Sequence, residues 1–431
     1  MGAANVPRSM AVSETGAAEA AALGPIGVDP EVQLLVPRRD AVEPELSIVI
    51  PALDEEVTVG DFVEWCHEGL AAAGITGEVV IVDSSSDRTS EIALEHGARV
   101  LRTPRRGLGR AYIDALPYAR GEYILMGDAD CTYDFRQLAP FVEQLHSGYE
   151  FVMGSRWAGS IEPGAMPWLH QYLGTPVTTW ILNFLYGSRF SDIHCGMRAI
   201  RRDSFARMNL TSQSWEYASE MVLKSVRMDL RTAEVPVRFL KDREGRESHH
   251  KRAGWTAPWK AAWINLRAMF IYGADFFVLK PGLLALALGL LLTLPLSFGP
   301  VALGAVTFSL YWMLAGMTLS IVGLQCFYLG CIAQVLYDYT GVARARWLGL
   351  FPYTRTVALS AAAFLLGILL TVPLIVDYVR SGLELPGEPG AVHHLAVTGL
   401  LAMIVGFTTF AFTLVLHAAA MAFSGRDGRS L

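Results

Sequence analysis

Charged residues are scarce in this sequence. Only 18% of its 431 residues are Asp, Glu, Lys or Arg, whereas a soluble domain usually carries about 25%. Hydrophobic residues make up 52% of the chain, so we expect part of it to lie in lipid. The formal net charge of −6 gives no support to nucleic-acid binding.

Cysteines are also few, and they show no pairing pattern. Their number is odd, they are scattered, and none of them forms a C-x-x-C motif. The sequence therefore predicts neither a disulfide framework nor a zinc site, and free thiols in a reducing compartment fit better. The five are Cys66, Cys131, Cys195, Cys326 and Cys331.

The start of the chain lacks the features of a signal peptide. Residues 1–40 are rich in Ala, Gly, Pro and Glu, and they have neither a basic flank nor an unbroken apolar run. They show no sustained period either. We expect residues 1–44 to form a disordered cytoplasmic tail.

Short apolar runs alternate with amphipathic segments from about residue 45 to residue 250. The runs at 46–50, 79–82 and 123–126 have the length and composition of buried strands. Alternation of this kind predicts an α/β domain with a parallel sheet covered on both faces. Ligands of such sheets gather at the carboxyl ends of the strands, and that is where acidic residues follow each run.

Beyond residue 275 the chain becomes strongly apolar. Within 276–424, four spans are long enough to cross a bilayer, which takes roughly 20 residues. Basic residues gather on one side of these spans, so the positive-inside rule places the α/β domain and the short tail at 425–431 in the cytoplasm, at the plasma membrane. The spans cover about 278–297, 304–334, 355–377 and 395–423.

Two further segments are rich in aromatic residues at helical spacing. Residues 251–275 contain Trp255, Trp259 and Trp263, and residues 167–186 contain a similar series. Such stripes are often core, but Trp and Tyr beside a membrane domain favour the headgroup level. We expect 251–275 to be an interfacial amphipathic helix, whereas 167–186 fits either role.

The central chemical signal is Asp128-Ala129-Asp130, directly after a predicted strand. Two carboxylates two residues apart on a turn can face one hard cation, so Asp128 and Asp130 are candidate ligands of Mg²⁺ or Mn²⁺. Acidic pairs after strands are also common helix caps. Further acidic groups at Asp54-Glu55 and at Asp83 favour the metal site, because carboxylates at three neighbouring strand ends repel one another unless a ligand uses them.

Several motifs occur in the order typical of one family. They are Arg106-Gly107-Leu108-Gly109-Arg110-Ala111-Tyr112, Gly121-Glu122-Tyr123, the Asp128–Asp130 motif, Gly154-Ser155-Arg156, Ser191-Asp192, Gly196-Met197-Arg198 and Glu234-Val235-Pro236. Together they resemble the dolichyl-phosphate mannose and glucose synthases and their bacterial polyprenyl-phosphate relatives, which are inverting family-2 glycosyltransferases. The resemblance implies a GT-A fold over 45–250, a nucleotide-sugar donor and a polyprenyl phosphate acceptor.

The same resemblance assigns roles to individual residues. It implies that nucleoside and diphosphate are held by Pro51, Ala52, Asp54, Glu55, Asp83, Asp128 and Ala129. The implied catalytic residues are Asp128, Asp130, Arg156 and Arg198, with Asp128 and Asp130 at the metal. The implied acceptor and phosphate contacts are Arg156, Ser191, Arg198, Glu220, Ser248 and His249.

Three positions depart from the family pattern. Asp54 stands where an Asn is usual, and Ser84 stands where Asp or Asn often follows Asp83. His249 replaces a lysine, which would make a phosphate contact there depend on pH, unless His249 and His250 are only a solvated loop pair.

The chemistry follows from the acceptor. A lipid phosphate is already anionic near neutral pH, so it can attack the anomeric carbon without a strong general base. The protein must then supply position and charge neutralisation, for which arginines such as Arg156, Arg198, Arg201 and Arg202 are suited. A single displacement predicts inversion.

Two other functions stay open at this point. A processive polysaccharide synthase shares the donor fold, but no glutamine here begins the Q-x-x-R-W motif of such enzymes. A lipid translocase would use the apolar region, whose sparse charge argues against ion transport. The donor is expected to be UDP-glucose or otherwise GDP-mannose, and a homo-oligomer is left open.

Overall fold

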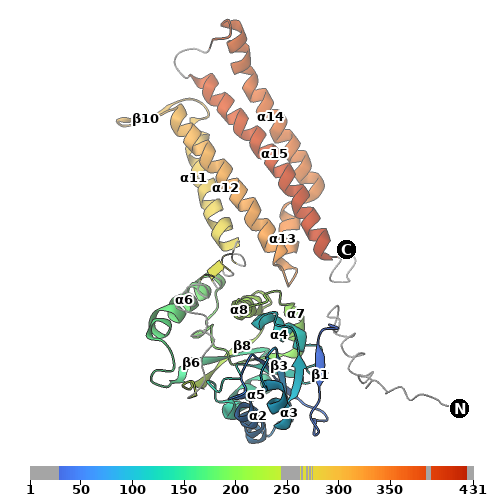
Figure 1. Ribbon diagram of the computed structural model, residues 1–431. Coiled ribbons are helices and arrows are strands. Elements are labelled where there is room, and N and C mark those ends of the chain that lie inside the picture. Colours follow the sequence, from blue (N-terminus) through green and yellow to red (C-terminus); the bar gives the residue numbers. More distant parts are fainter. Residues whose placement is uncertain are drawn as a thin grey trace, which may run out of the picture. The chain divides into compact units, whose positions relative to one another are not determined.

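The chain divides into two compact units, residues 1–269 and residues 270–431. A computed structural model describes residues 29–243, 275–384 and 390–424, together with the single residues 263, 266, 267, 270 and 273 (Figure 1). Most of the predicted interfacial helix at 251–275 lies outside the described residues, as do Ser248 and His249.

An eight-stranded mixed sheet forms the centre of the first unit. Its spatial order is β1-β4-β3-β2-β5-β7-β6-β8. Strands β2, β3, β4 and β5 run parallel, as predicted, whereas β7 runs antiparallel to both of its neighbours, so the expectation of a wholly parallel sheet is wrong for this half. The strands are β1 (Gln33–Leu35), β2 (Leu46–Ala52), β3 (Gly77–Asp83), β4 (Arg99–Arg102), β5 (Tyr123–Met126), β6 (Phe151–Ile161), β7 (Arg198–Arg201) and β8 (Thr232–Phe239).

Helices cover both faces of this sheet (Figure 1). The apolar strands explain why, since Ile48 and Val49 point to opposite faces of β2 and both are buried, so each face needs a covering layer. One layer consists of α2 (Val59–Ala73), α3 (Thr89–Glu95) and α5 (Ala139–His146). The other consists of α4 (Leu108–Ala115), α7 (Arg202–Met208) and α8 (Tyr217–Arg227).

The edge of the sheet is closed by a strand that the sequence did not predict. Strand β1 pairs antiparallel with β4, with Gln33 opposite Arg102 and Leu35 opposite Val100. The predicted disordered tail at 1–44 is therefore wrong for residues 33–35. A three-residue strand is too short to show a period of its own, and its order comes from pairing with an edge that is already formed.

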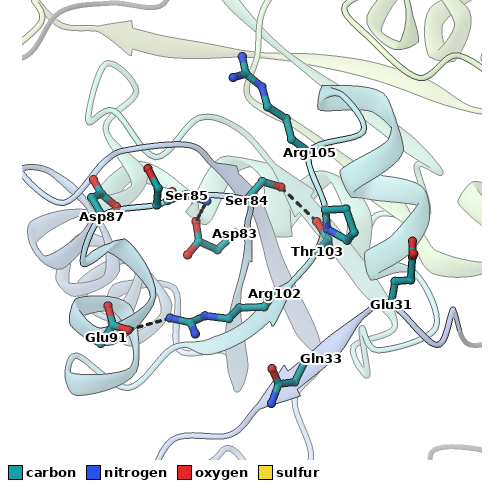
Figure 2. Close-up of a pocket in the computed structure, with 12 residues that line it drawn as sticks. Glu31, Gln33, Asp83, Ser84, Ser85, Asp87, Glu91, Arg102, Thr103 and Arg105 are labelled. Carbon is teal, nitrogen blue, oxygen red and sulfur yellow. Dashed lines mark hydrogen bonds and ion pairs between the residues drawn. The ribbon is translucent and has the colours of Figure 1, made fainter.

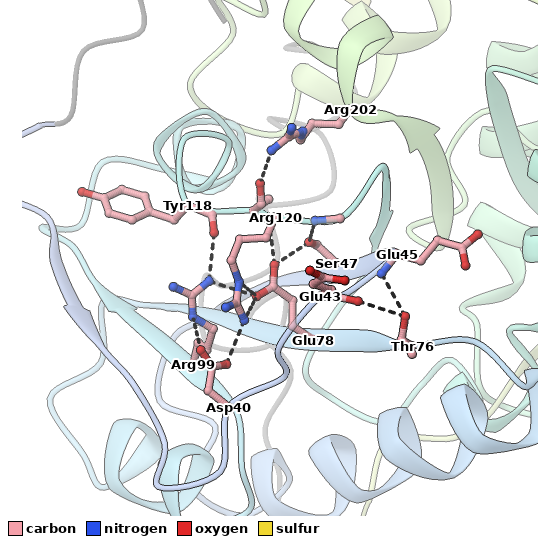
Figure 3. A network of polar contacts seen from close by, with 12 residues as sticks. Asp40, Glu43, Glu45, Ser47, Thr76, Glu78, Arg99, Tyr118, Arg120 and Arg202 are labelled. Atoms are coloured by element: carbon pink, nitrogen blue, oxygen red, sulfur yellow. Dashed lines mark hydrogen bonds and ion pairs between the residues drawn. The ribbon is translucent and has the colours of Figure 1, made fainter. Parts of the chain in front are cut away.

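A buried ionic network joins the amino ends of the central strands (Figure 3). The Glu78 carboxylate accepts hydrogen bonds from Ser47 Oγ at 2.6 Å, from the Arg120 backbone N–H at 2.7 Å and from Arg99 Nη1 at 2.9 Å. Arg120 also reaches Asp40 at 2.9 Å. The network ties β2, β3 and β4 together at the edge of the sheet opposite the acidic strand ends.

The second unit contains the four predicted apolar helices. Their apolar spans are Phe276–Leu296, Leu310–Leu336, Tyr353–Arg380 and Ala391–Ala422, each long enough to cross a membrane. The prediction of a span beginning near residue 304 is wrong at that end, because β9 (Val301–Leu303) and β10 (Val306–Phe308) form a hairpin there. The helical elements are η3 (Asp275–Leu279), α11 (Lys280–Leu296), α12 (Leu310–Leu336), α13 (Val342–Leu350), α14 (Tyr353–Arg380) and α15 (Ala391–Ser424).

Glycines let these helices pack with their backbones in contact. A Cβ atom added to Gly323 of α12 would lie 2.2 Å from the Leu286 nitrogen of α11, and one added to Gly289 would lie 2.4 Å from the Ser320 nitrogen. Close approach through small residues is a usual source of helix association in lipid, where burial of apolar surface gives little driving force. The glycines thus fix α11 against α12.

Candidate functional site

The predicted acidic clusters do meet at one edge of the sheet. Ala52 at the end of β2 is the register partner of Asp83 at the end of β3, and β5 pairs with the other side of β2. The loop after β2 is tied to the loop after β3, because the Asp54 N–H donates to Ser85 Oγ at 2.7 Å and the Ser86 N–H donates to Asp54 Oδ1 at 3.2 Å. The two loops therefore form one structural unit.

Asp54 has a left-handed backbone conformation, with a φ of 55°. Asn and Asp tolerate this region better than other residues with a side chain, because their short polar group bonds locally. The Oδ1 atom accepts from Ser86, a bond that an Asn oxygen could make equally well. The departure from the usual Asn at this position is thus compatible with the loop structure.

The side chain of Asp83 stabilises the loop that follows β3. Its side chain is only 3% exposed, Oδ1 accepts from the Ser85 N–H at 2.9 Å, and Oδ2 accepts from Ser90 Oγ. A turn at Ser85 and a bond to Ser90 of α3 therefore account for the contacts of this carboxylate within the chain. A contact with the nucleoside stays a prediction, as it does for Pro51 and Ala52 on β2 and for Glu55, whose N–H donates to Thr89 Oγ1 at 3.0 Å.

Asp128, Ala129 and Asp130 form the turn that follows β5. Both aspartates are partly exposed, whereas Ala129 between them is buried. Asp130 Oδ1 accepts from the N–H and the Oγ1 of Thr132, at 3.0 and 2.5 Å. These two bonds fix the plane of the Asp130 carboxylate.

Asp128 lies against a glycine from another loop. A Cβ atom on Gly196 would be only 2.6 Å from Asp128 Oδ2, so a larger residue at 196 would displace the carboxylate. The Gly196 N–H donates to the Tyr133 hydroxyl at 2.8 Å, and the Tyr112 hydroxyl donates to the Gly127 carbonyl at 2.9 Å. The turn is thus held from both sides by buried tyrosines.

The residues present fit a divalent cation only if the substrate completes its coordination. The described residues contain no group of three or more His, Cys, Asp or Glu side chains that could hold a metal. Asp128 and Asp130 offer carboxylate oxygens, which Mg²⁺ and Mn²⁺ prefer, and Mg²⁺ sites commonly combine one or two carboxylates with substrate phosphates and water.

Arg156 is paired inside the domain. Its Nε and Nη2 atoms donate to the two carboxylate oxygens of Asp192 at 2.6 and 2.8 Å, and its own side chain is 8% exposed. This bidentate pair anchors the loop that starts at Ser191. The sequence presents Asp192 only as part of a motif and does not mark it as the partner of Arg156.

Arg198 anchors the other end of the same loop. Its Nη2 donates to the Cys195 carbonyl at 2.5 Å and its Nη1 donates to the Ala218 carbonyl at 3.2 Å, while the residue is 1% exposed. Both arginines therefore hold the loop that carries Gly196, and neither was predicted to do so. Their contact with phosphate stays a prediction.

Arg201 and Arg202 lie at the wrong edge of the sheet for phosphate binding. Because β7 runs antiparallel to β5, Arg201 is the register partner of Tyr123, at the start of β5. Arg202 donates to the Ala119 carbonyl at 2.8 Å. These two arginines mark the end of β7 and the start of α7.

The buried carboxylate of Glu220 holds the loop at Thr211 and Ser212. It is completely buried, it forms an ion pair with Lys224 at 2.5 Å, and it accepts from the backbone N–H groups of Thr211 and Ser212 at 3.0 and 2.8 Å. The pKa of Glu220 is lowered: burial raises it, but Lys224 and the hydrogen bonds outweigh that effect. Glu220 therefore fixes the loop at Thr211 and Ser212, and its contact with the acceptor stays a prediction.

That loop supports the turn before α4. A Cβ atom on Gly109 would lie 2.3 Å from the Ser212 carbonyl, and one on Gly107 would lie 2.3 Å from the Gln213 carbonyl. Gly107 also has a φ of 110°, which a residue with a side chain rarely adopts. The two glycines of the Gly-Leu-Gly motif are thus required by backbone contact.

Ser191 lies in a polar cluster with Glu234 and Ser155. Its N–H donates to Glu234 Oε1 at 2.8 Å, and its hydroxyl lies 2.6 Å from Ser155 Oγ. Burial raises the pKa of Glu234.

His194 lies near this cluster and contacts α6 (Thr175–Tyr186). Burial lowers the pKa of His194 to about 4, so the ring is neutral near pH 7. Its Nε2 lies 2.9 Å from Thr178 Oγ1 of α6.

An open pocket of about 580 Å³ lies beside Asp83 (Figure 2). Its lining is mostly polar and comes from the loop after β3, from the end of β4 and from the N-terminal segment that carries β1. The sequence did not indicate the last of these, because residues 1–44 were expected to be disordered. The lining residues are Glu31, Gln33, Asp83, Ser84, Ser85, Ser86, Asp87, Glu91, Arg102, Thr103, Pro104 and Arg105.

Two regions of the chain match known protein families. Residues 47–208 match the family "Glycosyl transferase family 2", and residues 331–420 match the "Glycosyltransferase family 2 C-terminal transmembrane region". The mixed sheet domain followed by four apolar helices agrees with the GT-A fold and membrane region expected from the motifs.

The curated relatives are glycosyltransferases. The low-salt glycan biosynthesis hexosyltransferase Agl6 of Haloferax volcanii is 37% identical, over 71% of this chain and 72% of that protein. A dolichyl-phosphate hexose transferase of the same organism is 30% identical, over 49% of this chain and 90% of that protein. Among solved structures, glucosyl-3-phosphoglycerate synthase from Mycobacterium tuberculosis in complex with Mn²⁺ and UDP-glucose is 19% identical, with a TM-score of 0.40 over 53% of this chain and 79% of that chain. The chain belongs to glycosyltransferase family 2.

Proposed function

We propose that this glycosyltransferase moves a hexose from a nucleotide-sugar to a polyprenyl phosphate, with inversion at the anomeric carbon. The observation that carries the proposal is the Asp128–Asp130 turn, which shares a sheet edge with the joined loops after β2 and β3 in a chain that has four membrane-length helices. The relative named as a dolichyl-phosphate hexose transferase supports a lipid phosphate as acceptor.

The donor would lie along the ends of β2, β3 and β5. In this arrangement Pro51, Ala52 and Asp83 contact the nucleoside, with Asp54 and Glu55 shaping the loop. Asp128 and Asp130 would hold a divalent cation, which would neutralise charge on the departing diphosphate. Arg156 and Arg198 then act as positioning residues, because they fix the two ends of the loop that places Gly196 against Asp128.

The reaction needs no strong base. An oxygen of the lipid phosphate forms the new bond to the anomeric carbon while the bond from that carbon to the diphosphate oxygen breaks. The attacking oxygen is already ionised, and the nucleoside diphosphate leaves with the electron pair. The neutral His194 and the buried Glu220 take no part in this step.

The basic residues of the apolar unit support a cytoplasmic site. Lys280 begins α11, Arg344 and Arg346 lie on α13, and Arg355 lies in the first turn of α14. By the positive-inside rule these helix ends face the cytoplasm, and the catalytic domain precedes Lys280 on that side. The β9–β10 hairpin would face the opposite side.

A panel of nucleotide-sugars tests the proposed reaction. Full-length protein, polyprenyl phosphate and Mg²⁺ or Mn²⁺ are combined with UDP-glucose, GDP-mannose and other donors, and the lipid product is identified by mass spectrometry and NMR. We expect one donor, with UDP-glucose favoured, to give a β-linked product from an α-linked sugar. Transfer from none of the donors would contradict the proposal, and an α-linked product would contradict the single displacement.

The aromatic face of α6 predicts a second result. Trp180 and Phe184 on α6, and Trp168 and Tyr172 in the helical turns just before it, are all exposed. The Trp180 and Phe184 rings stack with their centroids 5.5 Å apart, whereas Leu182 on α6 is completely buried. Exposed aromatic surface of this kind marks a contact with a membrane or partner, and the buried side of α6 reaches the site loop through Thr178 and His194. We therefore expect α6 to lie at the lipid surface beside the acceptor.

Replacing both Trp180 and Phe184 by Gln should impair use of the lipid. We expect the KM for a long-chain polyprenyl phosphate in vesicles to rise about tenfold, which corresponds to about 1.4 kcal/mol and fits partial burial of the two aromatic side chains in lipid. The KM for the nucleotide-sugar should stay unchanged. Val42→Ser, which alters an exposed apolar residue on another segment, is the control. An unchanged lipid KM in the double variant would exclude a membrane role for this face.

A further inference from the structure

The N-terminal segment Asp29–Leu35 forms one wall of the pocket beside Asp83. Figure 2 shows Glu31 and Gln33 on this segment, across the pocket from the loop that carries Asp83 and Asp87. The segment precedes the stretch that matches the glycosyltransferase family, which begins at residue 47. The wall is therefore a feature of this chain that the family match does not include.

Ionic contacts hold the segment in place. Asp29 and Glu31 both pair with the Arg106 guanidinium, and Arg110 Nη2 lies 3.5 Å from Asp29 Oδ2. Arg106 and Arg110 belong to the Gly-Leu-Gly-Arg motif. The motif that begins α4 thus also fixes the N-terminal segment beside the strand ends.

The strand register directs Gln33 to the pocket side of the sheet. Gln33 lies directly opposite Arg102 in the antiparallel pair, and directly opposed residues place their side chains on the same face. Arg102 Nε donates to Ser90 Oγ at 3.0 Å and Nη2 donates to Glu91 at 2.7 Å, so this face adjoins the loop that Asp83 and Ser90 hold together. Gln33 is exposed there, and its amide offers both a donor and an acceptor.

We propose that the Asp29–Leu35 segment is part of the donor site and that Gln33 contacts the nucleoside of the nucleotide-sugar. This inference rests on the proposed function, which assigns Asp83 to the nucleoside. An amide with paired donor and acceptor groups suits the edge of a nucleobase, which presents the same two kinds of group. The segment would therefore contribute to donor affinity and to the choice between bases.

Nucleotide titration of the full-length protein tests the proposal. Wild type, Gln33→Ala and the control Arg39→Ala are titrated with UDP, with GDP and with inorganic pyrophosphate in the presence of Mg²⁺. Arg39 is exposed, lies four residues beyond the segment and does not line the pocket. We expect Gln33→Ala to weaken binding of the preferred nucleotide about five- to tenfold, the loss of one or two hydrogen bonds, and to change the ratio of UDP to GDP affinity. Pyrophosphate binding should be unchanged, and Arg39→Ala should bind like the wild type.

The outcomes separate this inference from the proposed function. Equal nucleotide affinity in Gln33→Ala and wild type would overturn the nucleoside contact. An equal loss of pyrophosphate affinity would overturn it as well, because the effect would then not arise at the base. If wild type bound neither nucleotide, the proposed function itself would be contradicted.

Discussion

Asp130→Asn is expected to lower sugar transfer roughly 1000-fold while leaving the protein folded. Loss of one preorganised electrostatic group at a reacting centre costs about 100- to 1000-fold, and the loss of a metal ligand should lie at the upper end. Asn is a more specific substitution than Ala, because its side-chain oxygen can still accept the two hydrogen bonds from Thr132. The turn then keeps its shape, and only the charge is removed.

Two measurements distinguish loss of the metal site from loss of structure. Mn²⁺ binding in the presence of a nucleoside diphosphate, followed by electron paramagnetic resonance, should weaken in Asp130→Asn in parallel with activity. Thr132→Val is the matched control, since it removes a hydroxyl from Asp130 Oδ1 but keeps the carboxylate, and it should cost only a few-fold. Near-normal turnover and Mn²⁺ binding in Asp130→Asn would remove the metal-site proposal.

The sequence was most informative where local pattern decides the structure. Apolar runs ending at Pro51, Asp83 and Gly127 predicted three parallel strands with acidic loops at one edge, and the structure confirms the parallel pairing of β2 with β3 and β5. The four apolar spans were equally clear, because a helix in lipid must be long and apolar whatever it packs against. The antiparallel β7 was missed, since strand direction depends on a distant partner.

Side-chain partners could not be predicted in the same way. Arg156 and Arg198 have the charge that a phosphate needs, yet Arg156 pairs with Asp192 and Arg198 binds carbonyl oxygens. Glu220 likewise pairs with Lys224. Such contacts arise when residues far apart in the chain are brought together, and a charged residue inside a domain requires a partner. The motifs therefore identified important residues but not what each one binds.

The charged residues at the two ends of the strands differ in their burial. At the carboxyl ends, Asp128 and Asp130 remain partly exposed, as a substrate-binding site requires. At the amino ends, Glu78 and Arg99 are buried and form an ion pair, 2.9 Å apart. Substitutions at the first edge should affect transfer, whereas substitutions at the second should affect folding.

Glu78→Gln is expected to destabilise the catalytic domain by about 3 kcal/mol, because removing one charge from a buried pair leaves the other uncompensated. Arg99 would keep its bond to the Tyr118 carbonyl, at 3.0 Å, but would lose its buried carboxylate. For a domain of this size we expect the unfolding temperature to fall by roughly 10 °C in a thermal scan of the full-length protein. Glu122→Gln is the control, since Glu122 is exposed and its pair with Arg201 should contribute less than about 1 kcal/mol.

The loss of stability caused by Glu78→Gln should become smaller as the pH falls. The pKa of Glu78 is lowered from its ordinary value of 4.5, because burial, which raises it, is outweighed by bonds from Ser47 and Arg120 and by the charge of Arg99. A carboxylate with a lowered folded pKa stabilises the protein fully above its unfolded pKa, and that contribution is lost as the pH falls through the folded pKa. The difference in stability between wild type and Glu78→Gln should therefore be constant near neutral pH and shrink at pH values below about 4. A difference that stayed constant through this range would show that Glu78 contributes through shape and not through its charge.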